Sequence, residues 1–188
     1  TVSAGPQLKV IAAGLLSDVS VASCRRLAGS VGGRLVDEIS LSDRASVEKH
    51  LQEALQERPE IILFSGGTEG GATRAVLNTA TLIHSVCRLL PDGKRPVVLF
   101  VGNQVLAEKV ENMLNEDTMV YSVPNIRPQI AVQDLSPAQY ELAEIMALLR
   151  TQQLGGLEVI SQATNVPLMP TSFVFGRVFR YLSQVNAQ

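Results

Sequence analysis

A glycine-rich loop holds the residues of this chain that are best suited to bind a ligand. Two glycine pairs bracket a threonine and a glutamate, directly after the short apolar run 61–64. The loop consists of Gly66, Gly67, Thr68, Glu69, Gly70 and Gly71. Glycine lets the backbone adopt positive φ values and lets a ligand approach it closely. A helical pattern follows, and a helix start offers unpaired N–H groups and a partial positive charge, so the loop is a candidate site for an anion or a polar ligand.

The loop does not match the known phosphate-binding motifs. It lacks the Gly-Lys-Ser/Thr of a P-loop, and its glycine spacing differs from Gly-x-Gly-x-x-Gly. Glu69 would repel a phosphate, although its carboxylate can accept hydrogen bonds from hydroxyl or ammonium groups. Three interpretations stay open. The loop is a tight turn with Thr68 as helix cap and Glu69 beside the helix dipole, or a contact for a polar ligand or partner, or a phosphate site.

Three more residues are expected near this loop. Asp18 follows the first predicted strand, Arg74 lies one turn into the helix after the loop, and Asn103 follows the fourth predicted strand. Each also has a simpler interpretation, as a helix cap for Asp18 and Asn103 and as a solvated cation for Arg74. We predict that these three residues and the six loop residues line a polar-ligand crevice. Asn125 and Arg127 lie on a proline-stiffened loop at the same predicted edge, and this loop is a candidate surface for a partner.

Acid–base and metal chemistry have little support in the sequence. No Ser/His/Asp or Cys/His set is evident, and His50 and His84 fall within predicted helices, away from strand ends. The spacing of Cys24 and Cys87 fits no metal motif, which indicates buried free thiols and a cytosolic compartment. We therefore predict no catalytic residue and no metal site.

Five short apolar runs alternate with helical patterns along the chain. The predicted strands cover residues 8–13, 34–39, 61–64, 97–101 and 119–123. The predicted helix starts are Ser17 or Asp18, Ser42 or Asp43, the end of the glycine loop, Asn103, the capping box Ser136-Pro137-Ala138-Gln139, and Thr171.

This alternation predicts an α/β fold, with a parallel five-stranded sheet between two layers of helices. Right-handed crossovers favour the flavodoxin-like order 2-1-3-4-5. Ligands of such sheets bind beyond the carboxyl ends of the strands, where the strand order reverses. Residues 14–18 and 65–70 would form the two walls of that crevice. We expect one compact unit, with the sheet in residues 1–134 and a helical extension packed on it in residues 135–188.

Composition excludes several classes of protein. The 188 residues are 46% hydrophobic and 18% charged with a net charge of −2, which is typical of a globular domain. Aromatic residues make up only 4%, and without a basic stripe a nucleic-acid partner is not expected. The apolar runs are too short to span a membrane. The chain begins at Thr1 without a signal-peptide pattern, so we expect a cytoplasmic piece of a longer protein.

The last segment is rich in aromatic residues for this chain. It contains Phe173, Phe175, Phe179 and Tyr181. Docking of these rings into the core is one interpretation. The other is a surface that meets a neighbouring domain, which would leave an exposed apolar patch.

Four stretches occur in a characteristic order with short gaps. They read PEIILFSGGTEGGATRAVLNTA, RPVVLFVGNQ, VYSVPNIRPQIAVQDLSPAQ and VPLMPTS. Together they resemble the MutL/GlmL-type family, the accessory proteins encoded with adenosylcobalamin-dependent glutamate mutase. The resemblance covers nearly all of the chain. Glu69 stands where many relatives carry Asp, and Asn-Ile-Arg-Pro at 125–128 replaces a stretch that is often similar to Asn-Val-Met-Pro.

The resemblance implies an actin-like ATPase that acts as a reactivating factor or chaperone for the mutase. The two Asp-x-Gly-type phosphate-binding strands of that family are not in this chain. The resemblance therefore implies an internal, non-catalytic domain that binds no cofactor itself, in a parent protein that uses ATP and Mg²⁺. Its partners would be the mutase subunits and the flanking domains. The alternative is a small-molecule or phosphate-binding α/β domain that uses the crevice at residues 66–71.

Overall fold

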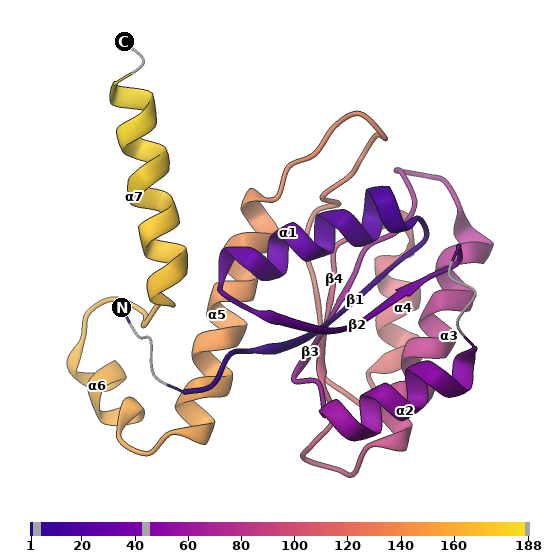
Figure 1. Ribbon diagram of the computed structural model, residues 1–188, viewed down its shortest axis with the longest axis horizontal. Coiled ribbons are helices and arrows are strands. Elements are labelled where there is room, and N and C mark those ends of the chain that lie inside the picture. The colour runs from indigo at the N-terminus through magenta and orange to yellow at the C-terminus, as the bar shows by residue number, and fades with distance from the viewer. Residues whose placement is uncertain (2–4, 43–45, 187–188) are drawn as a thin grey trace.

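Five parallel strands form one sheet in the order β2-β1-β3-β4-β5, with helices on both faces (Figure 1). The computed structural model describes residues 1, 5–42 and 46–186. The strands are β1 (Lys9–Gly14), β2 (Arg34–Ser40), β3 (Ile61–Phe64), β4 (Val97–Phe100) and β5 (Val120–Ser122). The predicted α/β class and strand order are confirmed.

The central strands are continuous apolar runs because both of their faces are covered. Every residue of β3 and β4 is buried. Ile61 of β3 pairs with Val10 of β1 on one side and with Val97 of β4 on the other. The edge strands β2 and β5 are only partly buried, which fits their more polar sequences.

Side chains that alternate along each strand face two separate cores. Val10 and Ala12 pack with helices α1 (Ala22–Ser30) and α5 (Ser136–Gln153). The next residues along the strand, including Ile11 and Ala13, face the second core. That core is completed by α2 (Val47–Glu57), α3 (Thr73–Leu89) and α4 (Ala107–Leu114). The result is the predicted three-layer arrangement.

The predicted caps of three helices are wrong by one to a few residues, although two of these helices begin at the predicted residue. Helix α2 begins at Val47, and its cap is Ser46, whose hydroxyl accepts a hydrogen bond from the Lys49 amide at 3.3 Å. Ser42 lies before that cap, and Asp43 lies outside the described residues.

The other two errors concern residues that are already helical. Ser136 is the first residue of α5, and its amide donates to Asp134 Oδ1 at 2.9 Å, so the predicted capping box does not form. Thr171 is the first residue of α7 (Thr171–Val185), whose cap position is Pro170. At the start of each of these two helices, several residues that could cap the helix lie next to one another. The sequence alone therefore does not show which of them is the cap.

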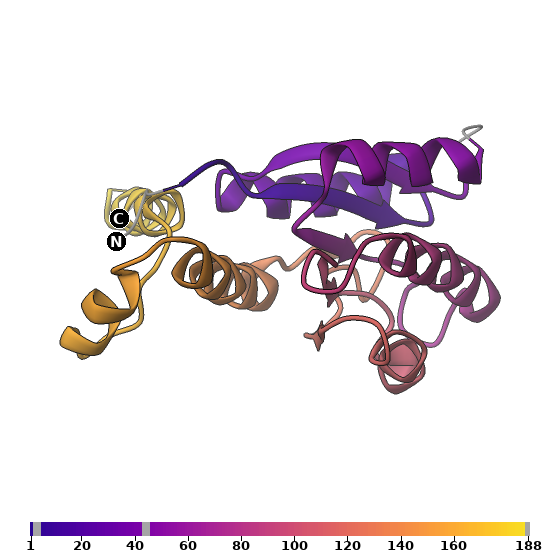
Figure 2. The same ribbon diagram turned by 90° about the horizontal axis from the view of Figure 1, so that it is seen from below.

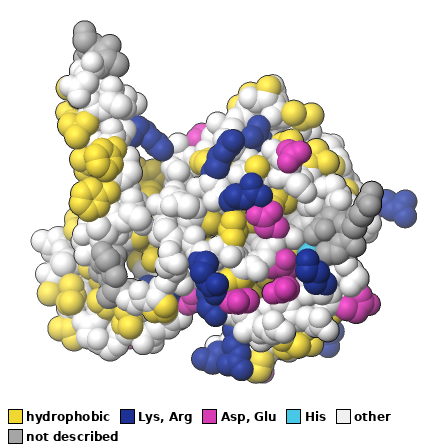
Figure 3. Space-filling view, in the orientation of Figure 1, with side chains coloured by type: hydrophobic (Ala, Val, Ile, Leu, Met, Phe, Trp, Pro, Cys, Tyr) yellow, Lys and Arg dark blue, Asp and Glu magenta, His cyan; other side chains and the backbone are white. Residues whose placement is uncertain are grey.

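Helices α6 (Leu157–Ala163) and α7 lie at one end of the molecule, beyond α5 (Figures 1 and 2). Phe173 in the first turn of α7 is buried, with its ring edge-on to Tyr140 at 5.3 Å between centroids. Phe175 and Phe179 are exposed, and Figure 3 shows hydrophobic side chains along this helix. Phe173 thus docks as the first interpretation predicts, and the exposed rings form the kind of apolar patch that the second requires. That this patch meets a neighbouring domain stays a prediction, as does the domain division at residue 134.

Within residues 1, 5–42 and 46–186, no helix combines the length and the apolar character that a membrane crossing requires.

Candidate functional site

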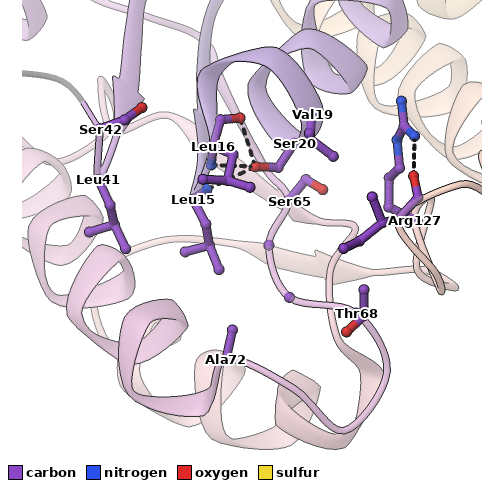
Figure 4. Close-up of a pocket in the computed structure, with 13 residues that line it drawn as sticks. Leu15, Leu16, Val19, Ser20, Leu41, Ser42, Ser65, Thr68, Ala72 and Arg127 are labelled. Carbon is purple, nitrogen blue, oxygen red and sulfur yellow. Dashed lines mark hydrogen bonds between the residues drawn. The ribbon is translucent and has the colours of Figure 1, made fainter.

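A cavity of about 470 Å³ lies at the carboxyl ends of β1 and β3, where the strand order reverses (Figure 4). Its apolar lining comes from Leu15, Leu16, Val19, Leu41, Ala72 and Ile130. Its polar lining comes from Ser20, Ser42, Ser65, Thr68 and Arg127, together with the backbone of Gly66 and Gly67. Residues from both predicted walls therefore meet in one cavity, and most of its side chains are apolar.

The first wall of the cavity is held in shape by Ser20, a buried serine after β1. The Ser20 hydroxyl accepts hydrogen bonds from the amides of Leu15 and Leu16, each at 2.9 Å, and donates to the Leu16 carbonyl at 3.1 Å. These bonds fold the chain into the short helical turn η1 (Ser17–Val21). Gly14 permits the close approach, since a Cβ there would lie 2.7 Å from the Ser20 hydroxyl. Asp18 lies on the same turn but is exposed and does not line the cavity.

The second wall is the glycine loop, and the amides of its second half are bound by the protein itself. The amides of Glu69, Gly70 and Gly71 donate to Pro128 O, Asn103 Oδ1 and Thr68 O respectively, at 2.9 to 3.2 Å. A phosphate cradle needs such N–H groups to point at the ligand. Because these three amides have protein acceptors, they cannot form a phosphate cradle, whereas the amides of Gly66, Gly67 and Thr68 at the cavity have no acceptor within the described residues.

Asn103 is a buried support of this loop. Its Oδ1 accepts hydrogen bonds from Gly70 N at 3.2 Å and Val105 N at 3.1 Å, and its Nδ2 donates to Gly71 O at 2.9 Å. The bond to Val105 confirms the predicted cap, which begins the short helix η2 (Gln104–Leu106). The two bonds to the loop are an addition that the sequence did not reveal.

The interpretation of Thr68 as a helix cap is wrong. Helix α3 begins only at Thr73, after Ala72 in the left-handed region with φ of 53°. Thr68 lies five residues earlier and faces the cavity instead. Glu69 is exposed, and its carboxylate accepts a hydrogen bond from Gln104 N at 3.3 Å. Arg74 is the second residue of α3, not one turn into it, and it is exposed outside the cavity.

The structure thus brings together three of the nine predicted site residues. Those that line the cavity are Gly66, Gly67 and Thr68. Those that do not are Asp18, Glu69, Gly70, Gly71, Arg74 and Asn103. Among the latter, Gly70, Gly71 and Asn103 shape the loop through the hydrogen bonds described above. Whether the crevice binds a ligand stays a prediction.

Arg127 is a charged lining residue that the predicted site did not include. It lies on the loop after β5, with Nε donating to Ser23 Oγ at 2.9 Å and Nη1 donating to Ile130 O at 2.7 Å. Asn125 joins this loop to the glycine loop, because its Nδ2 donates to Gly67 O at 3.1 Å. The sequence placed both residues at the correct edge of the sheet. It did not show that the loop folds back over the strand 1 and strand 3 ends.

The thiol beneath the cavity is not a nucleophile at neutral pH. Burial raises the pKa of Cys24 to about 12, and its Sγ lies 3.8 Å from the Ala13 carbonyl oxygen. A thiol with so high a pKa stays protonated. In the described part of the chain, no three His, Cys, Asp or Glu side chains lie together in a way that could hold a metal ion.

Comparison with known proteins gives a family match over the whole chain. The family model described as MutL protein matches residues 1–188. The Protein MutL of Clostridium tetanomorphum is 26% identical over 183 residues, which cover 97% of this chain and 37% of that relative. The chain therefore spans a little over a third of the length of this relative. No solved structure matches the chain.

Proposed function

Because this chain belongs to the MutL protein family, we propose that it is an internal domain of an ATP-dependent reactivating factor for adenosylcobalamin-dependent glutamate mutase. The observation that carries the proposal is the family match over residues 1–188, in a chain that covers 37% of its relative. In this proposal the nucleotide-binding strands lie in the remainder of the parent protein. This domain would then contribute contacts rather than chemistry.

The described site supports a non-catalytic role. The thiol of Cys24 is buried and protonated, and the two histidines lie on helices, each bound to an aspartate. The exposed loops at the carboxyl edge of the sheet are tied together by Asn103 and Asn125, so they present a preformed surface. We propose that this edge contacts the mutase or its cobalamin subunit and responds to the nucleotide state of the parent protein.

A pull-down of the mutase subunits by the full-length protein tests this proposal, with and without ATP and Mg²⁺. We expect the retained amount of mutase to depend on the nucleotide. Substitution of Glu69, which is exposed on the proposed edge, by Arg should weaken retention more than Arg88→Glu, at the far end of α3. Absence of mutase binding in both nucleotide states would remove this function.

A second candidate function is favoured by the cavity itself. Ligand sites are concave and mostly apolar, with volumes of about 300–1,000 Å³ and a few well-placed polar groups. The cavity at the ends of β1 and β3 has about 470 Å³ and that kind of lining. We propose that the domain binds a small molecule there.

Calorimetry with the full-length protein tests whether the small molecule is a phosphate compound. ATP, ADP and inorganic phosphate test the phosphate version, and Gly67→Val should abolish any binding at the crevice. Gly67 has a φ of 74°, and a Cβ on it would lie 2.9 Å from the Gly71 carbonyl oxygen. If the heat of nucleotide binding is still measured with Gly67→Val, the nucleotide binds to the strands expected elsewhere in the parent protein.

A further inference from the structure

The cavity at the ends of β1 and β3 has leucines in one part of its lining and Thr68 and Arg127 in another. Figure 4 shows Leu15 and Leu41 on one side, and Thr68 and Arg127 on the other. The Ser65 hydroxyl points toward the side on which Arg127 lies. A molecule that fills this space would therefore place hydrocarbon against the leucines and its polar end near Ser65, Thr68 and Arg127.

Ser65 supplies an unused polar group at the wall of the cavity. The residue is only 1% exposed, and its hydroxyl has no hydrogen-bond partner within the described residues. Most buried polar side-chain atoms in native structures have a partner, so each exception needs an explanation. A bound molecule with a hydrogen-bonding group would satisfy this hydroxyl.

Arg127 supplies a positive charge that is already held in place. Its bonds to Ser23 Oγ and Ile130 O fix Nε and Nη1, while Nη2 has no acceptor within the described residues. Among those residues Arg127 also forms no ion pair, unlike Arg25 with Glu38 or Arg150 with Glu60. A guanidinium of this kind can bind a carboxylate with little loss of side-chain entropy.

From these three observations we infer that the cavity binds a small monocarboxylate with an apolar body. The carboxylate pairs with Arg127, the Ser65 hydroxyl donates a hydrogen bond to the polar end of the molecule, and the hydrocarbon packs against the leucines. One cation matches one negative charge better than it matches the several charges of a nucleotide phosphate. The inference rests on the second proposed function and names its ligand class.

Ligand-observed NMR with the full-length protein tests the inference, with octanoate as the anionic probe and 1-octanol as the neutral one. The two share their hydrocarbon chain and differ in charge. A hydrogen bond to a charged group is strong enough that we expect octanoate to bind about tenfold more tightly than 1-octanol. Arg127→Gln should raise the Kd of octanoate about tenfold and leave that of 1-octanol almost unchanged.

Two further variants complete the design. Arg88→Gln removes an equal charge from the exposed far end of α3, so it should leave both affinities within about twofold. Ala72→Phe places a large ring at an exposed residue of the cavity mouth and should abolish binding of both probes. Because Ala72 is exposed at the start of α3, this variant is expected to fold, and circular dichroism checks that it does.

The outcomes distinguish a failure of the carboxylate inference from a failure of the proposed small-molecule site. Equal binding of octanoate and 1-octanol, both lost in Ala72→Phe, would keep a small-molecule site and overturn the carboxylate. Unchanged octanoate affinity in Arg127→Gln would overturn the assigned role of Arg127. No binding of either probe at about 10 mM would overturn the inference and leave only the mutase contact, which the pull-down decides independently.

Discussion

Arg150 is a buried cation that joins three segments distant in the sequence. It lies on α5 and is 2% exposed. Its Nη1 donates to Glu60 Oε1 at 2.7 Å, and its Nη2 donates to Glu60 Oε2 at 3.1 Å and to the Pro6 carbonyl at 3.0 Å. The segment before β1, the turn before β3 and the last turn of α5 are thus held together at the amino edge of the sheet, opposite the cavity.

We expect Arg150→Met to lower the free energy of unfolding by about 3 kcal/mol, because it leaves the Glu60 carboxylate without its cation. Urea unfolding of the 188-residue chain, followed by circular dichroism, measures the change. The matched control is Arg88→Met, whose side chain is 68% exposed, with an expected change within about 0.5 kcal/mol. If both variants lose the same free energy of unfolding, the buried Arg150–Glu60 pair contributes no more to stability than an exposed arginine.

Glu60 gives this pair a defined response to acid. Burial acts to raise its pKa, but hydrogen bonds from Arg150, Gln153 and the Lys9 amide outweigh burial and hold the pKa below the ordinary value of 4.5. A carboxylate whose pKa is lower in the folded state stabilises the fold at pH values above its unfolded pKa. That contribution disappears as the pH falls through the folded pKa.

The pH dependence of Glu60→Gln tests this response. We expect the variant to be less stable than the parent chain near pH 6, with the difference shrinking toward about pH 3 as Glu60 becomes protonated. Urea unfolding at a series of pH values gives both curves. Two parallel curves over this range would mean that Glu60 does not titrate differently in the folded and unfolded chains.

At the scale of the element, the packing of the glycine loop on its neighbour sets a tight steric limit. Gly102 follows β4, and a Cβ on it would lie 2.7 Å from the carbonyl oxygen and 2.8 Å from the nitrogen of Gly66. Both atoms belong to the backbone, so they cannot move aside as a flexible side chain would. The ends of β3 and β4 approach closely only because residue 102 has no side chain.

Gly102→Ala should therefore lower the free energy of unfolding by about 2 kcal/mol, the usual cost of overpacking. Gly29→Ala is the control, since a Cβ at that position in α1 meets nothing within 4 Å. That change should leave the stability unaltered or raise it by up to about 1 kcal/mol, because alanine is the better helix former. Both free energies come from urea unfolding, and a neutral Gly102→Ala would contradict the close approach.

A helix or strand could be predicted from the sequence where a single local pattern, such as an apolar run, pointed to it without a competing alternative. Ile61–Phe64 and Val97–Phe100 are apolar runs between turn residues, and both form strands as predicted. Helix starts were harder, because Ser42, Asp43 and Ser46 are all suitable caps and only packing selects the last. The start of α3 shifted past Thr68 because the loop is held by Asn103, a residue of a different strand end.

At the scale of the whole molecule, the position of the site was predictable and its lining was not. The strand order fixes the switch between β1 and β3, and this rule alone places a crevice beside residues 14–18 and 65–70. Leu41 and Ile130 reach the cavity from distant parts of the chain, and no periodicity connects them. Arg127 stayed outside the predicted site for the same reason.

Helix α7 shows how one buried ring attaches a whole element to the body of the molecule. Phe173 is 5% exposed and packs edge-on to Tyr140, with the Arg177 guanidinium 5.1 Å from the Tyr140 ring centroid. Phe179, further along the same helix, is 66% exposed. The apolar side chains beyond the first turn of α7 are thus largely uncovered (Figure 3).

We expect Phe173→Ala to release α7 from the rest of the chain, because the loss of a buried Phe costs about 3 kcal/mol. The amides of α7 should then exchange with deuterium up to about 100-fold faster, while those of β3 and β4 keep their protection. Hydrogen-exchange mass spectrometry of the 188-residue chain measures both. Phe179→Ala is the control, and it should leave exchange in α7 nearly unchanged, since it removes an exposed ring. If the two variants accelerate exchange equally, Phe173 is not the anchor of this helix.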